Sequence, residues 1–430
     1  MKVGFVSLGC SKNLVDTEMC IHIFQENEFT IVNQPEQADI IVINTCGFID
    51  SAKQEGINTI LEMAEYKKKN CKCLIVMGCL VERYETELKK LLPEVDLFIS
   101  IKEYKNLWEK ITKKLNLQAK NNCQMDYFKR TITTGNKTAY LKIAEGCSNY
   151  CTYCAIPYIR GKYQSRKKEE ILEEAKQLAS KGIQELIVIA QDTTKYGIDL
   201  YGKEMLADLL KELEKIEGIH WIRFLYAYPE SITEELIQVV KNSTKICHYF
   251  DIPIQHITDH VLKRMNRKSD GASIKRIIAT IRKEIPDVII RTTLILGFPG
   301  ETKEDFEELY HFVEQEKFDR LGAFAYSKEE GTPAAKFKEQ IHPATKKARW
   351  EKIMELQKNI VEENMKKYIG TKQEILIEAE EKDYYIARSK MDVPDMDGVI
   401  YVEKNKSIHI GDFIEVEITG TEEYDMMAKK

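Results

Sequence analysis

Short apolar runs that alternate with helical segments are the feature that most constrains the fold of this chain. In the first hundred residues, three runs rich in Val and Ile, "KVGFVSLGC", "ADIIVINTC" and "CLIVMGC", are each followed by a helical stretch. Near-continuous apolar strands separated by amphipathic helices are typical of a parallel sheet that is buried on both faces. We therefore expect an α/β fold that begins with a parallel sheet in residues 1–112.

Each of these runs ends at a cysteine, namely Cys10, Cys46 or Cys79. In open parallel α/β sheets, ligands bind at the carboxyl ends of the strands. Cysteines used only for packing would lie inside the strands, so their repeated place at the strand ends favours a shared ligand-binding site. Five other cysteines show no such register and are interpreted as core or surface thiols: Cys20, Cys71, Cys73, Cys123 and Cys247.

A second set of apolar runs fills residues 133–366, after a polar linker predicted at residues 113–132. The six runs are "TAYLKIAEG", "ELIVIAQD", "WIRFLYAYP", "HYFDIPIQ", "VIIRTTLILGFPG" and "RLGAFAYS". The segments between them have helical spacing, acidic starts and glycine stops. Six βα units with right-handed crossovers predict a partial (β/α)6 barrel, in which function lies at the carboxyl ends of the strands.

The C-terminal end has a different pattern and a different charge. A long helix is predicted at residues 344–369, with Pro343 placed to open it. Residues 367–430 then alternate apolar and polar residues, which predicts a small antiparallel β-barrel. Residues 371–430 hold 8 Lys and Arg against 15 Asp and Glu, whereas the whole chain has a net charge of −5. The negative charge of this acidic module either keeps the protein soluble or attracts a basic protein partner. In both cases it repels the phosphates of nucleic acid.

The stretch "EGCSNYCTYCAIPYIRG" carries Cys147, Cys151 and Cys154 in the spacing CxxxCxxC. The chain shows no apolar run of membrane-spanning length and no signal peptide, so we expect a cytoplasmic protein, in which clustered thiols favour metal over disulfides. Three thiolates on a four-iron cluster leave one iron open for a substrate. Zinc is the alternative, but it generally takes a fourth Cys or His, and the loop holds no His.

This loop resembles the cysteine motif of radical S-adenosylmethionine (SAM) enzymes, and Tyr153, just before the last cysteine, fits that family. The resemblance implies that Cys147, Cys151 and Cys154 hold a 4Fe-4S cluster and that SAM chelates its fourth iron. By the same resemblance, an electron from the cluster cleaves SAM to a 5′-deoxyadenosyl radical.

Over nearly its whole length the chain resembles the methylthiotransferases, which combine a flavodoxin- or Rossmann-like sheet, a radical SAM barrel and a C-terminal TRAM barrel. "LGCSKNLVD", "NTCGFI" and "MGCL" look like the family's three ligand motifs. The resemblance implies that Cys10, Cys46 and Cys79 bind a second 4Fe-4S cluster, which carries the sulfur that one SAM methylates before transfer. A non-enzymatic two-cluster electron carrier is the alternative of another class, although such carriers usually hold each cluster with four protein ligands.

The stretch "ARSKMDVPDMDGVIYV" resembles the TRAM domain of one branch of this family, RimO. That branch adds a methylthio group to the β-carbon of an aspartate in the small-subunit ribosomal protein S-twelve. The acidic module agrees with such a substrate, and a tRNA adenosine 2-methylthiotransferase is the alternative. The C-terminal sequence "EEYDMMAKK" departs from the Gly-Glu ending that is expected after "YD" in this branch. This difference puts only the last strand of the C-terminal barrel in doubt.

Further partners and contacts follow from the resemblance. The implied partners are S-twelve or the small ribosomal subunit and a low-potential electron donor such as flavodoxin or ferredoxin, with no membrane. Direct tRNA binding is the less favoured alternative. Besides Tyr153, the residues predicted to contact SAM lie at or near barrel strand ends: Gln191, Asp192, Gln255, Arg291 and Gly297. Gly297 opens the loop "GFPGET", where a glycine permits close approach to a ligand and a simple turn is the alternative. No catalytic residue is assigned beyond the cluster ligands.

Overall fold

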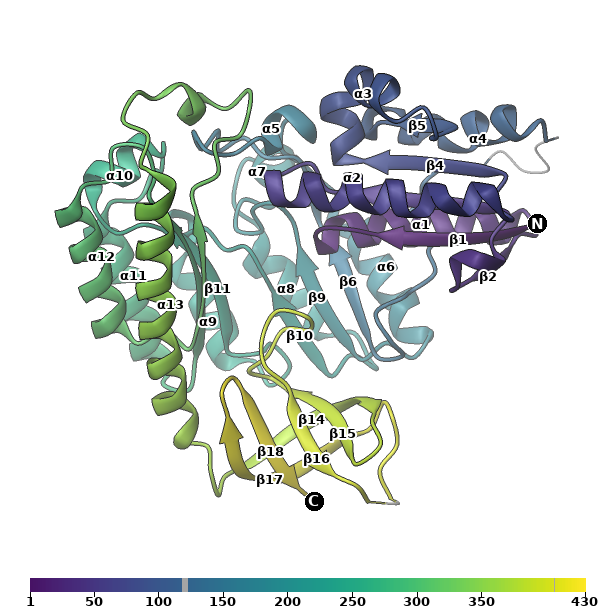
Figure 1. Cartoon of the computed structure of the whole chain (residues 1–430). Coiled ribbons are helices and arrows are strands. Elements are labelled where there is room, and N and C mark those ends of the chain that lie inside the picture. The colour runs from purple at the N-terminus through teal and green to yellow at the C-terminus, as the bar shows by residue number, and fades with distance from the viewer. Residues whose placement is uncertain (118–122, 406) are drawn as a thin grey trace.

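The computed structural model describes residues 1–117, 123–405 and 407–430. Figure 1 shows an N-terminal sheet, a central layer of strands and helices, and a small C-terminal barrel below the central strands. Residues 118–122 of the predicted linker lie outside the described residues. Within the part that is described, no helix is both long and apolar enough to cross a membrane.

The N-terminal sheet has the strand order β2-β1-β3-β4-β5, and every pairing in it is parallel. This is the order of flavodoxin-like folds, so the expected parallel sheet is confirmed. Its strands are β1 (Lys2–Ser7), β2 (Thr30–Val32), β3 (Ile40–Thr45), β4 (Cys73–Gly78) and β5 (Leu97–Ile99). Its helices are α1 (Ser11–Glu26), α2 (Asp50–Ala64), α3 (Cys79–Leu91) and α4 (Leu107–Leu115), with 3-10 turns at Pro35–Gln37, Glu65–Lys68 and Ile101–Asn106.

Two apolar cores, one on each face, explain why this sheet forms. Strands β3 and β4 are buried at every position. One core combines apolar residues of α1 and α4, such as Phe24 and Trp108, with one face of the sheet. The other combines α2 and α3, through residues such as Ile60 and Leu88, with the opposite face. Burial on both faces leaves the strand ends as the exposed edge, and β1, β3 and β4 each lead into one cysteine of the first triplet.

The central strands form two parallel sheets, β10-β9-β6 and β11-β12-β13. A parallel bridge between Ile222 and Ile246 joins them, with backbone hydrogen bonds of 2.8 Å on either side. The six strands therefore follow one another in chain order, as the predicted partial barrel requires. They are β6 (Thr138–Lys142), β9 (Glu185–Ile189), β10 (Trp221–Phe224), β11 (Tyr249–Gln255), β12 (Ile289–Leu296) and β13 (Arg320–Ala325), and a small hairpin pairs β7 (Ala144–Glu145) with β8 (Gln164–Ser165).

Helices between these strands cover the outside of the barrel (Figure 1). The helices of the central part are α5 (Ile156–Ile159), α6 (Lys168–Ser180), α7 (Ile198–Tyr201), α8 (Leu206–Glu214), α9 (Glu234–Asn242), α10 (Asp259–Arg264), α11 (Gly271–Glu284), α12 (Lys303–Glu316) and α13 (Pro343–Lys366), with 3-10 turns at Pro229–Ser231 and Pro333–Lys336. Of these, α5 lies beside the N-terminal part and α13 follows β13. The predicted long helix is α13. It begins at Pro343 as expected and ends three residues early, before Gly370 takes a φ of 80° and the chain enters the C-terminal barrel.

The C-terminal barrel is closed, in the order β14-β15-β16-β18-β17, but it is not wholly antiparallel as predicted. Strands β16 and β18 pair in parallel. The reason is topological, because a closed ring with an odd number of strands cannot alternate direction throughout. Strand β18 forms within the ending that the sequence put in doubt. The strands are β14 (Lys372–Glu380), β15 (Tyr384–Ser389), β16 (Ile400–Glu403), β17 (Phe413–Glu422) and β18 (Asp425–Lys429).

The two outer parts contact opposite ends of the central barrel. The C-terminal barrel packs on the amino ends of the central strands, where the Trp221 and Phe413 rings are 4.8 Å apart and Tyr249 donates to Asp397 at 2.6 Å. The N-terminal part packs on the carboxyl ends, where Lys142 at the end of β6 contacts Asp16 of α1 at 2.6 Å. The cysteine loops of both parts therefore lie at the end of the barrel away from the acidic module.

Candidate functional site

The first cysteine triplet lies at the carboxyl edge of the N-terminal sheet. Cys10 caps the start of α1, and Cys79 is the first residue of α3. The partial positive charge at a helix N-terminus favours a thiolate over a thiol. Cys46 follows β3, the strand between the other two.

Glycines beside the cysteines show how closely the three loops approach. A Cβ on Gly9, which has a φ of 89°, would lie 2.8 Å from the Cβ of Cys46. A Cβ on Gly47 would lie 2.7 Å from the backbone carbonyl of Cys79. The three cysteines also interact electrostatically with one another. The structure therefore brings Cys10, Cys46 and Cys79 to one place.

The protonation of these thiols depends on their surroundings. Burial raises the pKa of Cys79 to about 12 and also raises the pKa of Cys46. Desolvation acts on Cys10 as well, but the positive charges of Lys12 and Arg160 outweigh it, so the pKa of Cys10 is lowered. Because metal ligands must be deprotonated, iron that binds here has to displace protons from Cys46 and Cys79.

The second triplet lies in the loop between β7 and α5. Cys147 and Cys151 are buried and Cys154 is half-buried. Backbone hydrogen bonds from Cys147 to Gly161 at 3.1 Å and from Cys154 to Cys151 at 3.0 Å fold the loop back on itself. Burial raises the pKa of Cys147 to about 11, and burial together with the neighbouring Cys151 raises the pKa of Cys154. These three thiols also converge.

A cavity of about 530 Å³ is lined by residues from both cysteine loops. Phe48 and Ile49, just after Cys46, contribute from the N-terminal part, and Tyr153 contributes from the second triplet. Its other lining residues are Ser51, Gln255, Thr293, Ile295, Phe324, Ala325, Tyr326, Ser327 and Glu329. The volume is in the usual range for a small-molecule site, and most of its wall is apolar, so it can exclude water from chemistry between the triplets.

Glu329 holds the two walls of this cavity together. Its carboxylate, after β13, accepts from the Asp50 backbone N–H at 2.8 Å and from Lys53 Nζ at 3.0 Å. Arg83 approaches the same carboxylate at 3.4 Å and donates to the carbonyl of Gly47 at 2.6 Å. The contact fixes the loop of Cys46 against the barrel.

Of the residues predicted to contact SAM, Tyr153 and Gln255 line the cavity, and Gln255 has a φ of 69°. Gln191 and Asp192 lie instead against the second cysteine loop. Asp192 accepts from Asn149 Nδ2 at 2.8 Å, and Gln191 donates to Glu145 at 3.0 Å. Burial raises the pKa of Asp192.

Arg291 and Gly297 are engaged elsewhere. Arg291 contacts Asp251 at 3.0 Å and Asp397 of the C-terminal barrel at 3.6 Å, so its charge is already paired toward the amino ends of the strands. The backbone N–H of Gly297 donates to Glu301 at 2.7 Å, and a Cβ on Gly297 would lie 2.4 Å from Lys346 of α13. In this structure the glycine therefore accommodates a helix side chain.

The donor set fits iron-sulfur clusters better than a single metal ion. Within residues 1–117, 123–405 and 407–430, no group of three or more His, Cys, Asp or Glu side chains converges closely enough to hold one ion. Each triplet nevertheless gathers three cysteines, which are the usual ligands of a four-iron cluster, and such a cluster is wider than one ion.

Arg267 is a site residue that the sequence reasoning missed. It is buried after α10, and among the described residues its Nε and Nη1 atoms have no hydrogen-bond partner. Its guanidinium lies 4.3 Å from the ring centre of Tyr228 and interacts electrostatically with Cys151 and Tyr153. The available signal was the basic stretch "KRMNRK", residues 263–268, at the end of α10 and just after it.

Three family profiles match the chain. The Radical SAM superfamily matches residues 141–313, the Uncharacterized protein family UPF0004 matches residues 2–100, and the TRAM domain matches residues 369–430. Together they cover both cysteine triplets and the acidic barrel.

Curated relatives match over the full length. A protein of Alkaliphilus oremlandii named ribosomal protein uS12 methylthiotransferase RimO is 62% identical over 432 residues, which cover 100% of this chain and 99% of that protein. Proteins of the same name from Clostridium botulinum strain Hall and Clostridioides difficile are each 50% identical, over 99% of this chain and 97% and 98% of their own length.

Solved structures resemble the chain in fold alone. The radical SAM methyltransferase TsrM from Kitasatospora setae, solved with cobalamin and a [4Fe-4S] cluster, has a TM-score of 0.59 at 11% identity and covers 77% of this chain and 76% of its own. The cobalamin-dependent SAM radical enzyme OxsB has a TM-score of 0.52 at 14% identity and covers 84% of this chain and 56% of its own.

Proposed function

This chain belongs to the RimO family of ribosomal protein uS12 methylthiotransferases, and we propose that it replaces a hydrogen on the β-carbon of a uS12 aspartate with a methylthio group. The observation that carries the proposal is the cavity lined by residues next to both triplets, namely Phe48 and Ile49 after Cys46 and Tyr153 before Cys154, where a substrate would contact both cysteine loops. When bound, the clusters and SAM supply the radical, the sulfur and the methyl group.

We assign Cys10, Cys46 and Cys79 to the cluster that carries the sulfur, and Cys147, Cys151 and Cys154 to the cluster that binds SAM. The separate origin of the triplets supports this division, because one lies on the flavodoxin-like sheet and the other on the barrel. Three cysteines per cluster leave one iron open in each, as two reactive sites require. An electron carrier would have no need of two open sites or of a cavity between them.

We further propose that Arg267 binds the carboxylate of SAM. Its Nε and Nη1 atoms have no hydrogen-bond partner among the described residues, and a guanidinium donates charge-assisted hydrogen bonds to a carboxylate. Tyr153 and Gln255 then face the rest of SAM from the cavity wall. Asp192 and Gln191 support the cysteine loop through Asn149 and Glu145.

Replacing Arg267 with Met is expected to weaken SAM binding about 10- to 100-fold, which matches about 1.5–3 kcal/mol for a hydrogen bond to a charged group. Equilibrium dialysis with the reconstituted protein measures this affinity. Arg267→Lys keeps the positive charge but not the guanidinium, so its affinity for SAM should lie between those of the wild type and Arg267→Met. Arg282→Met on α11, where the guanidinium bonds to the carbonyl of Glu316, serves as the control and should bind SAM normally. Equal affinities of wild type and Arg267→Met would rule out this contact.

The substrate is proposed to be a basic protein and not tRNA. The acidic module attracts positive charge and repels phosphate. Because it lies at the end of the barrel away from the cysteine loops, it would hold a part of the substrate distant from the modified aspartate. A substrate that spans this length is a large one, such as uS12 within the small subunit.

The remaining assignments complete the proposal. A low-potential donor such as flavodoxin or ferredoxin supplies electrons, and the enzyme acts in the cytoplasm, where its ribosomal substrate is. The proposed domains are residues 1–112, 133–366 and 367–430, with a linker at 113–132. Each of the three matched profiles falls within one of these domains, while α4 (Leu107–Leu115) runs past residue 112 into the proposed linker.

Competition between the two substrate classes tests this function. The anaerobically reconstituted protein is incubated with SAM, a reductant and sulfide, and is offered the aspartate-bearing uS12 loop, whole small subunits and bulk tRNA together. We expect mass spectrometry to find a methylthio group on the aspartate. The same group on tRNA adenosine would replace our substrate with the alternative, and cluster loading with no product on either would reject methylthio transfer.

A further inference from the structure

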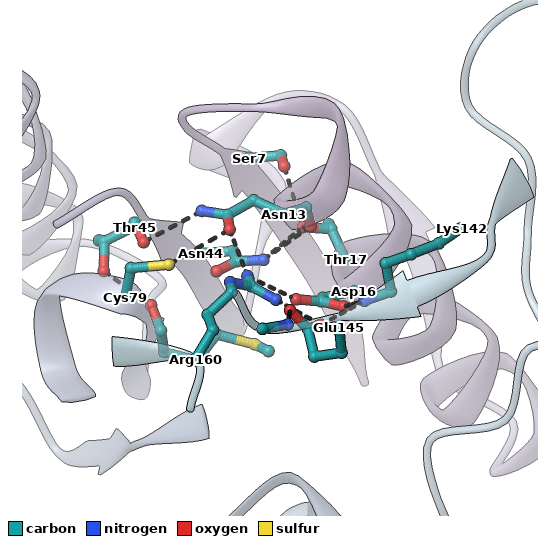
Figure 2. A network of polar contacts seen from close by, with 12 residues as sticks. Ser7, Asn13, Asp16, Thr17, Asn44, Thr45, Cys79, Lys142, Glu145 and Arg160 are labelled. Carbon is teal, nitrogen blue, oxygen red and sulfur yellow. Dashed lines mark hydrogen bonds and ion pairs between the residues drawn. The ribbon is translucent and has the colours of Figure 1, made fainter. Parts of the chain in front are cut away.

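A buried polar network connects residues that lie beside the two cysteine triplets. Arg160, six residues after Cys154, reaches from the barrel into the N-terminal part, and its side chain is only 2% exposed. Its Nη2 atom donates to Asn13 Oδ1 at 2.6 Å and to Asp16 Oδ2 at 2.9 Å, while Nη1 donates to Glu145 at 2.8 Å. Figure 2 shows the guanidinium between Asn13, Asp16 and Glu145.

Asn13 joins the three loops of the first triplet. Its Nδ2 atom donates to the carbonyls of Leu8 and Thr45, both at 3.1 Å, and Cys79 Sγ lies 3.5 Å from its Oδ1 atom. Leu8 precedes Cys10 by two residues, and Thr45 precedes Cys46 directly. Two carbonyl partners on the nitrogen and a guanidinium on the oxygen fix the orientation of this amide. With Cys79 as a cluster ligand, its thiol would no longer donate to this oxygen, and Arg160 would remain as its partner.

Glu145 and Arg160 lie on either side of the second triplet in the sequence. Glu145 lies two residues before Cys147 and accepts from Lys142, whose ammonium is 3.0 Å away and also contacts Asp16 at 2.6 Å. Two cations and two carboxylates thus alternate in a buried network. Its low dielectric makes each bond strong and each missing partner costly, so the network holds one geometry.

Arg160 is also the positive charge common to the first triplet. It interacts electrostatically with Cys10, Cys46 and Cys79. A positive charge stabilises an anionic cluster and makes it easier to reduce. Only an arginine has two donor arms with which to hold a carboxylate of the barrel and an amide of the N-terminal part together.

We infer that Arg160 and Asn13 are positioning residues that align the two cluster sites, so that SAM cleavage at one leads to sulfur transfer from the other. The inference rests on the proposed function, because it assigns one cluster to each triplet. If the network is weakened, SAM cleavage should continue while methylthio transfer falls. The two activities should not fall together. SAM cleavage needs only the second triplet, whereas transfer needs both triplets in register.

The test compares Asn13→Ala, Arg160→Lys and Arg160→Met with the wild type. The readout is the ratio of 5′-deoxyadenosine, the product of reductive SAM cleavage, to methylthiolated uS12 peptide. We expect this ratio to rise about tenfold or more in Asn13→Ala and Arg160→Met, since small misplacements in group transfer carry penalties of this size. Arg160→Lys, which keeps the charge, should fall between them and the wild type.

Arg130→Met is the matched control. Arg130 is an equally buried guanidinium between the same two parts, bonded to Glu18 of α1 at 2.6 Å and to Glu174 of α6 at 2.9 Å. It lies against the middle of α1, away from the cysteine loops. Its loss should lower stability as much as the loss of Arg160 but leave the product ratio unchanged.

Two readouts do not depend on activity. In a Cys147, Cys151 and Cys154 to Ala background, only the first cluster remains, and its reduction potential should fall in Arg160→Met and stay near that of the wild type in Asn13→Ala. In the cluster-free chain, Asn13→Ala should speed amide hydrogen exchange in residues 8–10 and 45–47 together. If Arg160→Met does not fold, Asn13→Ala and Arg160→Lys carry the test.

The outcomes separate this inference from the proposed function. If wild type makes methylthiolated peptide and the ratio is unchanged in Asn13→Ala and Arg160→Lys, or rises equally in Arg130→Met, positioning by this network is rejected and the proposed function stands. If wild type binds two clusters and makes no methylthio product, the proposed function fails first.

Discussion

A variant with Cys10, Cys46 and Cys79 all replaced by Ala is expected to lose about half of its iron, from about eight to about four per chain, since each four-iron cluster depends on its own thiolates. Methylthio transfer should fall below detection, while reductive cleavage of SAM continues. The physical reason is that each cluster is held by its own thiolates and the two sheets have their own main apolar cores, although Cys79 packs against Ala155 and Ile159 beside the second triplet. Iron and sulfide analysis and chromatography of 5′-deoxyadenosine measure the two effects.

A variant of the second triplet and two control variants test whether each triplet binds its own cluster. Replacement of Cys147, Cys151 and Cys154 should also halve the iron but abolish SAM cleavage. Cys71→Ala and Cys123→Ala remove thiols that lie away from both triplets and should change neither quantity. Retention of eight irons by the first variant would show that the cluster assigned to Cys10, Cys46 and Cys79 is bound elsewhere.

The position of both triplets could be predicted from sequence because strand ends are local features. Each of Cys10, Cys46 and Cys79 follows an apolar run, and the parallel order of the sheet then brings such ends to one edge. The spacing of the second triplet confines it to one loop without any knowledge of the fold. The cysteines of both triplets can therefore be recognised from the few residues around each of them.

Contacts between parts of the chain were not predictable in this way. Arg160 and Asn13 are 147 residues apart, and their sequence context resembles that of ordinary loop and helix residues. Arg291 lies in a predicted strand, but its pairing with Asp397 depends on where the C-terminal barrel docks. Arg267 was missed because a basic stretch on a loop is usually solvated, and only its burial reveals two unpartnered donors.

The parallel pair in the C-terminal barrel has a topological origin. Alternating polarity in the sequence indicates strands but not their direction, and the number of strands in the ring becomes visible only when it closes. The doubted ending supplies β18, whose Met426 and Ala428 are buried in the core even though the motif differs. Apolar alternation was thus the more reliable signal there than the match to a family ending.

Docking of the C-terminal barrel depends on one buried carboxylate, Glu185 at the start of β9. Arg388 of the C-terminal barrel contacts it at 2.5 Å and Arg223 of β10 at 3.4 Å, and none of the three side chains is more than 1% exposed. Arg223 also donates to the carbonyl of Lys390 at 2.8 Å. Burial alone would raise the pKa of Glu185, but the two guanidinium groups outweigh it and lower that pKa.

Glu185→Gln is expected to lower the free energy of unfolding by about 3–5 kcal/mol, because it leaves the buried guanidinium of Arg223 without its carboxylate partner and Arg388 with Glu378 alone. Glu374→Gln is the matched control. Glu374 also joins the two barrels, through His220 at 2.9 Å, but it is 39% exposed and should contribute less than about 1 kcal/mol. Urea unfolding followed by far-UV circular dichroism, which does not depend on the tryptophan that Glu374 contacts, measures both changes.

The pH dependence identifies the carboxylate as the cause. Since the folded pKa of Glu185 lies below its value in the unfolded chain, its stabilisation is fully present above the unfolded pKa of 4.5 and is lost as the pH falls through the folded pKa. The gap between wild type and Glu185→Gln should therefore be constant near neutral pH and narrow in acid. A gap that stays the same at every pH would mean that the side chain acts through packing, and that the acidic barrel is held to the central barrel by apolar contacts such as that between Trp221 and Phe413.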